Sequence, residues 1–208
     1  MFLTRVEIDT KKRAAMKLLS SLQVMHAVVE ACFDDDSRKL WRLDRFQNAL
    51  FILILSERKP NLTRMKEEYG YPNQSNEQDT KDYQKVLDMF QGGQIWRFRL
   101  RANPVHSVMG DKDSGTARGR VFPHVTAEHQ KKWLEERSER LGFSLKEFEI
   151  VQREEKKFKK RNQMVSLTTA TFEGILKIEN AEVFRSTVVS GIGRAKAYGC
   201  GLLTIARV

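Results

Sequence analysis

The sequence has few cysteines and no long hydrophobic run, and both absences exclude classes of protein. Its two cysteines, Cys32 and Cys200, lie far apart and form no C-x-x-C or His/Cys ligand spacing, which argues against a disulfide framework or a structural zinc site. No apolar stretch reaches the length of a membrane span, and the N-terminal residues lack the uninterrupted apolar segment of a signal peptide. We therefore expect a cytoplasmic protein that has buried thiols and does not bind a membrane.

Acidic residues are also too few to balance the basic ones. The chain has 208 residues, and its 37 Lys and Arg against 27 Asp and Glu give a net charge of +10. Charge of this sign and size is typical of a protein with a polyanionic partner such as a nucleic acid. The alternative is a basic surface that is merely solvated, and the positions of the charges must decide between the two.

The first half of the chain predicts a strand, a helix, two strands, a short helix and a closing apolar element. Residues 2–8 alternate like a strand, with Val6 and Ile8 on one face, and a helical pattern then runs from Leu18 to Phe33. Strand-like runs follow at 40–46 and 49–56, a helical stretch at 62–69, a polar loop at 70–79, and a short apolar segment around 86–90.

The second half predicts the same order of elements. It begins with a strand at 94–102, whose apolar residues alternate with arginines, so that one face is core and the other is cationic. A Gly/Asp/Ser loop at 110–119 leads to a helix that Thr126 caps and Gly142 ends. Strand-like segments at 144–151 and 164–179 flank a charged stretch as a long hairpin, Asn180 caps the next helix, and residues 202–208 form the last strand.

Each half thus has the order β-α-β-β-α-β, which is that of the ferredoxin-like fold. We predict an α+β protein of two tandem ferredoxin-like (RRM-like) domains, residues 1–92 and 93–208. The halves share no visible sequence repeat, so the duplication is inferred from the order of elements alone.

His26 is the candidate for proton transfer, because imidazole exchanges protons near neutral pH. On a continuous helix it lies at the edge of the apolar stripe, where a histidine is more often a surface residue. Ser20 followed by Gln23 resembles a capping box, which would put His26 near the start of a helix.

No metal or cofactor site is predicted. The run Asp34 to Asp36 has no ordered ligand spacing and is more typical of a solvated turn. The other histidines, His106, His124 and His129, have no paired carboxylate or metal-like spacing, and we expect no chemistry from them.

Three basic features in the second half are candidates for contact with RNA phosphates. They are Arg97, Arg99 and Arg101 on the first strand; Lys156, Lys157, Lys159, Lys160 and Arg161 in the long hairpin; and Gly191, Gly193, Arg194, Lys196, Gly199 and Gly201 in a glycine-rich loop. The loop does not fit the nucleotide motif G-x-x-x-x-G-K-[ST], and it fails G-x-G-x-x-G because Lys196 occupies the last glycine position. Its glycines permit positive φ angles and close approach of another backbone, and its amides can receive an anion.

The run "GIGRAKAYGCGLLTIA" resembles the C-terminal glycine-rich signature of the CasE family, the CRISPR repeat-RNA endoribonucleases of type I-E systems within the RAMP superfamily. The segments "MFLTRVEI", "MHAVVEACF", "WRFRLRANPV", "WLEERSERLGF" and "FEGILKI" occur in the order expected of that family, so the resemblance extends nearly from end to end.

The resemblance implies two ferredoxin-like domains that bind the stem-loop of a CRISPR repeat transcript and cut it once, at the base of the stem. It implies a metal-independent reaction in which the 2'-hydroxyl attacks the scissile phosphate and leaves a 2',3'-cyclic phosphate. His26 falls on the family's catalytic histidine, as general base or general acid. Some members have an assisting tyrosine at the position of Gln23, which cannot titrate, and Lys157 or Lys160 would then stabilise the charge on the phosphate.

The resemblance also implies that the product RNA is retained and that the protein joins the other subunits of a type I-E surveillance complex. A non-catalytic RNA-binding subunit of such a complex is one alternative. A general ribosomal or tRNA-binding protein is another, and it would bind unrelated hairpins with comparable affinity.

Overall fold

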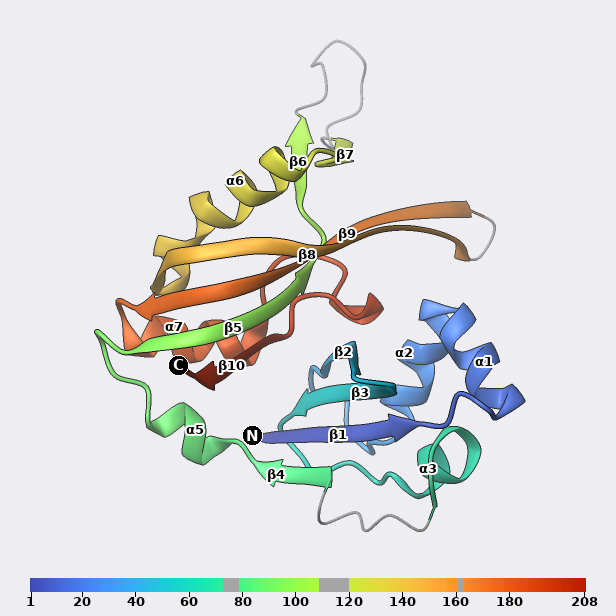
Figure 1. The fold of residues 1–208 in the computed structure, drawn as a ribbon. Coiled ribbons are helices and arrows are strands. Elements are labelled where there is room, and N and C mark those ends of the chain that lie inside the picture. Colours follow the sequence, from blue (N-terminus) through green and yellow to red (C-terminus); the bar gives the residue numbers. More distant parts are fainter. Residues whose placement is uncertain (73–78, 109–119, 161–162) are drawn as a thin grey trace.

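The computed structural model describes residues 1–72, 79–108, 120–160 and 163–208, and the side chains between 159 and 165 lie outside that description (Figure 1). Two four-stranded antiparallel sheets, each with its own helices, form the molecule. Among the described residues, no helix is both long and apolar enough to cross a bilayer.

The first sheet has the strand order β2-β3-β1-β4, which is the order of a ferredoxin-like domain. Alternation in β1 buries Val6 and Ile8 against the helices, as the sequence predicts. The elements of this half are β1 (Phe2–Ile8), α1 (Arg13–Ser20), α2 (Leu22–Glu30), β2 (Leu40–Phe46), β3 (Ala49–Ser56), α3 (Thr63–Tyr69), β4 (Thr80–Asp82) and α5 (Gln84–Asp88).

The predicted helix through residues 18–33 is broken at Ser21. Ser21 has extended backbone angles, and its hydroxyl accepts a hydrogen bond from the Val24 amide, so it is the N-cap of α2. The predicted cap, Ser20, instead ends α1 and donates to the Lys17 carbonyl. The predicted position of the cap is therefore wrong by one residue, but His26 does lie in the second turn of a separate helix.

The apolar segment at 86–90 is not the closing strand of the first half. That strand is β4, which pairs with Phe2 to Thr4 of β1, and the Thr4 and Thr80 hydroxyls lie 3.0 Å apart. The apolar segment forms α5 and the turn after it, because Leu87 and Phe90, three residues apart, both pack into the core of the second half.

The second sheet has the order β10-β5-β9-β8 and is the second ferredoxin-like unit. Thr126 and Asn180 cap α6 and α7 through their side chains, and Gly142 ends the first of these helical segments with φ 84°, all as predicted. The elements are β5 (Ile95–Ala102), β6 (Val105–Val108), β7 (Arg120–Pro123), α6 (Ala127–Ser138), the 3-10 helix η2 (Glu139–Leu141), β8 (Phe143–Lys160), β9 (Gln163–Ile178), α7 (Ala181–Ser190), the 3-10 helix η3 (Lys196–Tyr198) and β10 (Leu203–Arg207).

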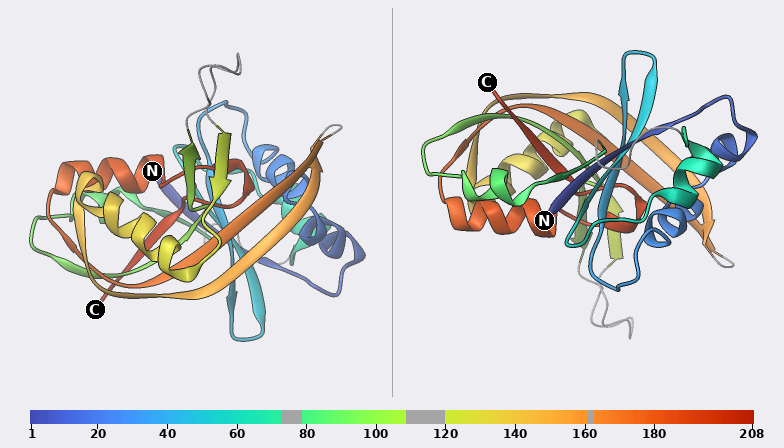
Figure 2. Two further views of the ribbon diagram at one scale, coloured as in Figure 1. Left: turned by 90° about the horizontal axis from the view of Figure 1, so that it is seen from above. Right: turned by 90° about the horizontal axis from the view of Figure 1, so that it is seen from below.

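The β6–β7 hairpin was not predicted, and the predicted 110–119 loop lies outside the described residues. The long hairpin is present, because β8 and β9 pair from Phe143 to Lys160. Its far end reaches across to the side of α1 and α2 in both views of Figure 2, and Leu167 is buried there in the core of the first half.

The two sheets are joined by a buried arginine as well as by apolar packing. Arg42 of β2 binds the Asp44 carboxylate with two hydrogen bonds, of 2.8 and 2.7 Å. Across the interface it donates to the Arg99 and Leu202 carbonyls at 2.8 and 2.9 Å and to the Thr204 hydroxyl at 2.7 Å. All five guanidinium N–H groups therefore have acceptors, which fixes one half against the other.

The predicted boundary between the two domains, at residues 92 and 93, falls in the turn between α5 and β5 and stays a prediction.

Candidate active site

His26 lies beside the glycine-rich loop, although the two belong to opposite ends of the sequence. An open depression of about 690 Å³ separates them. His26 and Glu30 line it from α2, Arg38 and Lys39 from the segment before β2, and residues 193–197 from the loop. The fold thus brings a proton-exchanging side chain and a cluster of cations from both halves to one place.

One ring nitrogen of His26 is buried, while the residue as a whole lines the depression. The Nδ1 atom is buried and lies 3.6 Å from Oε1 of Glu30, one helical turn later, while the side chain as a whole is 36% exposed. Among the described residues the buried Nδ1 atom has no hydrogen-bond partner, which leaves Nε2 as the nitrogen that can exchange a proton with a ligand.

Glu30 is held in turn by a buried lysine. The Lys39 side chain is fully buried, and its ammonium lies 3.4 Å from Oε2 of Glu30 and 3.3 Å from Oδ1 of Asp35. It also donates to the Asp35 carbonyl and lies over the Phe33 ring. Lys39 thereby fixes the carboxylate that faces His26.

Asp35 is more than the solvated turn that the acidic run predicts. A hydrogen bond from Ser37 lowers the pKa of its carboxyl group, with Lys39 as a further cause. Asp34 and Asp36, on either side of it, are exposed as expected. Neither Glu30 nor Lys39 stands out in the sequence, and only the four-residue spacing of His26 and Glu30 on a helix signals this arrangement.

The glycines of the loop allow it to pack directly against large side chains of the first half. Gly191, Gly193, Gly199 and Gly201 all have φ between +75° and +91°. A Cβ at Gly191 would lie 2.8 Å from the side chain of Leu40, and one at Gly199 would lie 2.8 Å from the ring of Trp41. The glycines are therefore required by backbone conformation and by close approach, whether or not they also contact RNA.

The two cations of the loop differ in accessibility. Arg194 is exposed at the rim of the depression. Lys196 is half-buried and donates to the Ser190 carbonyl at 2.7 Å, and its pKa is lowered by burial and then by the nearby charge of Arg38. Arg38, which the sequence did not single out, is exposed beside them.

The long hairpin presents different residues on its two faces. Phe158 packs against Tyr198 of η3 with ring centroids 4.8 Å apart. We call the hairpin face that carries Phe158 the inner face, because it turns toward the first half. Lys156 pairs with the buried Leu167 across the two strands and therefore lies on this inner face. Lys157 is on the outer face, 3.6 Å from Glu155. For Lys159 and Lys160 only the backbone is described, and Arg161 lies outside the described residues.

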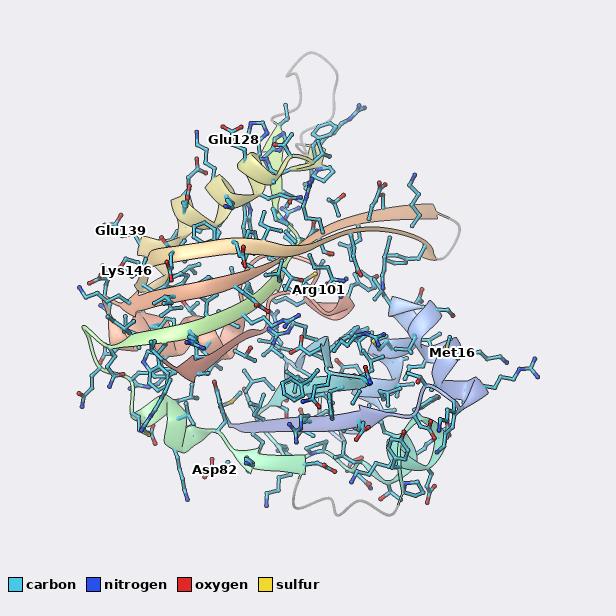
Figure 3. All side chains as sticks on the ribbon, viewed as in Figure 1. Met16, Asp82, Arg101, Glu128, Glu139 and Lys146 are labelled. Carbon is cyan, nitrogen blue, oxygen red and sulfur yellow. The ribbon has the colours of Figure 1, made fainter. Side chains whose placement is uncertain are left out.

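The arginine row of β5 is not a uniform cationic face. Arg97 is exposed, but Arg99 forms ion pairs with Asp44 at 3.4 Å and Glu173 at 2.7 Å. Arg101 is only 7% exposed, because its guanidinium pairs with Glu154 at 2.7 Å, and Figure 3 shows it near the middle of the molecule. Strand alternation gives the face correctly but not the acidic residues that neighbouring strands place on it. The prediction that Arg101 is accessible to RNA is therefore wrong, because Arg101 is buried and paired with Glu154.

Comparison with known proteins agrees with this architecture. The family model described as "CRISPR associated protein" matches residues 1–207. The CRISPR-associated endoribonuclease Cse3 of Thermus thermophilus is 30% identical over 99% of this chain and 100% of its own length. The CRISPR system Cascade subunit CasE of Escherichia coli is 30% identical over 52% of this chain and 56% of its own.

A solved structure is similar over the same extent. Thermus thermophilus Cse3, bound to an RNA representing a pre-cleavage complex, superposes with a TM-score of 0.76 at 28% identity and covers 99% of this chain and 98% of that one. The family model spans nearly the whole chain, and a relative at 30% identity covers both proteins almost completely. This chain therefore belongs to the CRISPR-associated protein family that its sequence resembles.

Proposed function

We propose that this protein is a metal-independent endoribonuclease that binds the stem-loop of CRISPR repeat RNA and cleaves the precursor at the base of the stem. The observation that carries the proposal is the position of His26, which lines a depression together with cations from both halves of the molecule. The names of the matching relatives, an endoribonuclease and a Cascade subunit, support the same activity. The site of action is the cytoplasm.

In the proposed reaction, the 2'-oxygen forms a bond to the adjacent phosphorus while the bond from phosphorus to the 5'-oxygen breaks. The products are a 2',3'-cyclic phosphate and a 5'-hydroxyl, so the 2'-hydroxyl loses a proton and the leaving oxygen gains one. The Nε2 atom of His26 exchanges one of these protons. A single well-placed group of this kind contributes about 100-fold to 10,000-fold to the rate.

Glu30 is proposed as a positioning residue for His26. Its Oε1 atom lies 3.6 Å from Nδ1 and orients the imidazole ring from that side, while Nε2 exchanges the proton. Lys39 keeps that carboxylate in place from the buried side. Glu30 thus acts through His26 and not on the RNA.

The charge that builds up on the scissile phosphate needs cations. Arg38 and Arg194 are exposed at the depression, and Lys156 lies on the hairpin face that turns toward the first half. We propose that these three side chains stabilise the charge on the phosphate. Lys157 is not proposed for this role, because it lies on the outer face of the hairpin. Gln23 is exposed and cannot transfer a proton, and the assignment of Lys160 stays a prediction.

The test is single-turnover cleavage of repeat RNA in EDTA, together with RNA affinity. We expect wild type to cleave, His26→Ala to lose about 100-fold to 10,000-fold in rate, and Glu30→Gln to lose about tenfold, which corresponds to about 1.4 kcal/mol. Affinity should stay within about twofold for both variants, since neither change removes a positive charge.

A matched control is Glu68→Gln on α3, which removes a carboxylate that also pairs with a residue four positions away, Arg64 at 2.6 Å. It should cleave at the wild-type rate. Full activity of His26→Ala, or no cleavage by wild type in EDTA, would contradict the mechanism. Tight binding of repeat RNA without cleavage would instead favour a non-catalytic RNA-binding subunit, and comparable affinity for unrelated hairpins would favour a general RNA-binding protein.

We also propose that the protein keeps the cleaved stem-loop and joins the other subunits of a type I-E surveillance complex. The support is the name of the Escherichia coli relative, a Cascade subunit. Co-purification of the product RNA, and of those subunits when they are co-expressed, tests this proposal.

A further inference from the structure

The rings of three of the four histidines lie next to one another in a row on the surface, and His26 is not among them. The rings of Phe122, His106, His124 and His129 follow one another with centroid separations of 6.0, 4.7 and 5.9 Å. We call these four residues the ring column. They come from β6, β7, the turn after β7 and the first turn of α6, so four neighbouring elements between residues 106 and 129 form one surface.

The ring column is exposed. Phe122 is 44% accessible, His106 and His129 are also exposed, and His124 is half-buried. Val125 beside them is 63% accessible. Phe122 and Val125 form an exposed apolar patch beside the polar imidazole rings, and such a mixed patch is more typical of a contact surface than of a core.

The ring column is not arranged as a metal site. Successive rings are inclined by 30° to 46° and lie beside one another in series, whereas metal ligands converge on one point. Within the part of the chain that the structure describes, no group of three His, Cys, Asp or Glu side chains could hold a metal ion. The pKa of His124 is lowered by its burial and then by His106 and His129, which favours the neutral ring.

The ring column adjoins the outer face of the basic hairpin. Arg153 of β8 donates to Oε1 of Gln130 at 3.0 Å and also to the Val125 carbonyl, so it joins the root of the hairpin to the start of α6. Lys157 lies four residues along the strand on the same face. Arg120 is exposed at the start of β7. Cations therefore lead from the hairpin to the ring column.

We propose that the ring column is a stacking site for an unpaired nucleotide next to the RNA stem. Aromatic and imidazole rings stack on any base, and neighbouring Arg and Lys side chains hold the phosphates. Charge complementarity favours RNA over a protein partner, because exposed cations flank the rings on the hairpin side. This inference rests on the proposed function, since it assumes that the hairpin binds the stem.

The experiment compares two RNAs, a blunt repeat stem-loop and the same stem-loop with unpaired nucleotides on both sides, each with a 2'-deoxy nucleotide at the cut site to prevent cleavage. For wild type we expect the unpaired nucleotides to increase affinity about 5-fold to 150-fold per stacked base. The variant His106→Ala, Phe122→Ala should lose this increase and still bind the blunt stem-loop like wild type.

A matched control is Phe46→Ala, which removes another exposed ring, 66% accessible, at the end of β2 in the first half. It should keep the full increase. His129→Ala is a second test on a different element, and it should lose part of the increase. A 2-aminopurine base at the unpaired positions gives a direct readout, since its fluorescence should be quenched by wild type and not by the double variant.

An increase in affinity that survives the double variant, with quenching unchanged, overturns the inference, and the exposed rings would then be assigned to a protein partner. No difference between the two RNAs for wild type overturns it as well. Failure of wild type to bind even the blunt stem-loop would contradict the proposed function itself, and the two failures are thereby distinguished.

Discussion

Replacing Gly199 by alanine should destabilise the protein through both backbone strain and a clash. Gly199 has φ +75° and ψ 25°, a left-handed conformation that costs an alanine about 1–2 kcal/mol. The added Cβ would lie 2.8 Å from Cζ3 of Trp41, whose ring is only 1% exposed and cannot move aside. Overpacking of this kind costs about 1–3 kcal/mol. We therefore expect Gly199→Ala to lower the free energy of unfolding by about 2–5 kcal/mol.

Gly93→Ala separates the two contributions. Gly93 has a similar φ, +88°, but a Cβ there would meet no atom within 4 Å. It should lose only the strain, about 1–2 kcal/mol, and any change in the entropy of the unfolded chain is the same for both variants. Urea unfolding followed by circular dichroism measures the difference, which should be about 1–3 kcal/mol. Equal losses for the two variants would refute the reasoning that the loop packs directly on Trp41.

Two further changes test the junction and the buried thiols. Arg42→Met should lower the free energy of unfolding by about 3–5 kcal/mol, because the Asp44 carboxylate of the first half and the Arg99 and Leu202 carbonyls of the second lose their donor. Arg45→Met, at an exposed arginine of the same strand, is the control, and a loss below about 1 kcal/mol for Arg42→Met would contradict its role. Burial raises the pKa of Cys32 to about 11 and of Cys200 to about 12, from 9.0. The folded state therefore keeps protons that the unfolded chain releases above pH 9, so stability is complete below pH 9 and falls as pH rises toward 11, by about 1.4 kcal/mol per pH unit for each thiol. Urea unfolding between pH 8 and 10.5 should show this fall relative to the double variant Cys32→Ala, Cys200→Ala, and parallel curves would contradict it.

The parts of the fold that local signals determine were predictable. Asn180 and Thr126 accept hydrogen bonds from amides two or three residues later, so the helix starts are encoded within a few positions. The closing strand of the first half was missed because its three residues have no periodicity of their own. Its pairing with β1 involves residues 76 positions apart, such as Thr4 and Thr80.

The candidate site shows the same limit. The resemblance pointed to His26, and the glycine-rich run was visible as a motif, yet nothing local indicates that they share one depression. Arg101 was predicted to be accessible because alternation is a property of one strand. Its partner Glu154 is 53 residues away on another strand, and only the folded sheet brings the two charges together.

The depression lined by α2 and residues 193–197 has a consequence for synthesis of the protein. Arg42 and Leu202, whose hydrogen bond joins the two halves, are 160 residues apart. The first half can form its own sheet while translation continues, but the cations of the loop are added only when the ribosome has passed residue 197. If the proposed function holds, a nascent chain that already contains His26 but not yet the loop would be unable to cut repeat RNA. Nuclease activity would then begin only with molecules whose translation has passed residue 197.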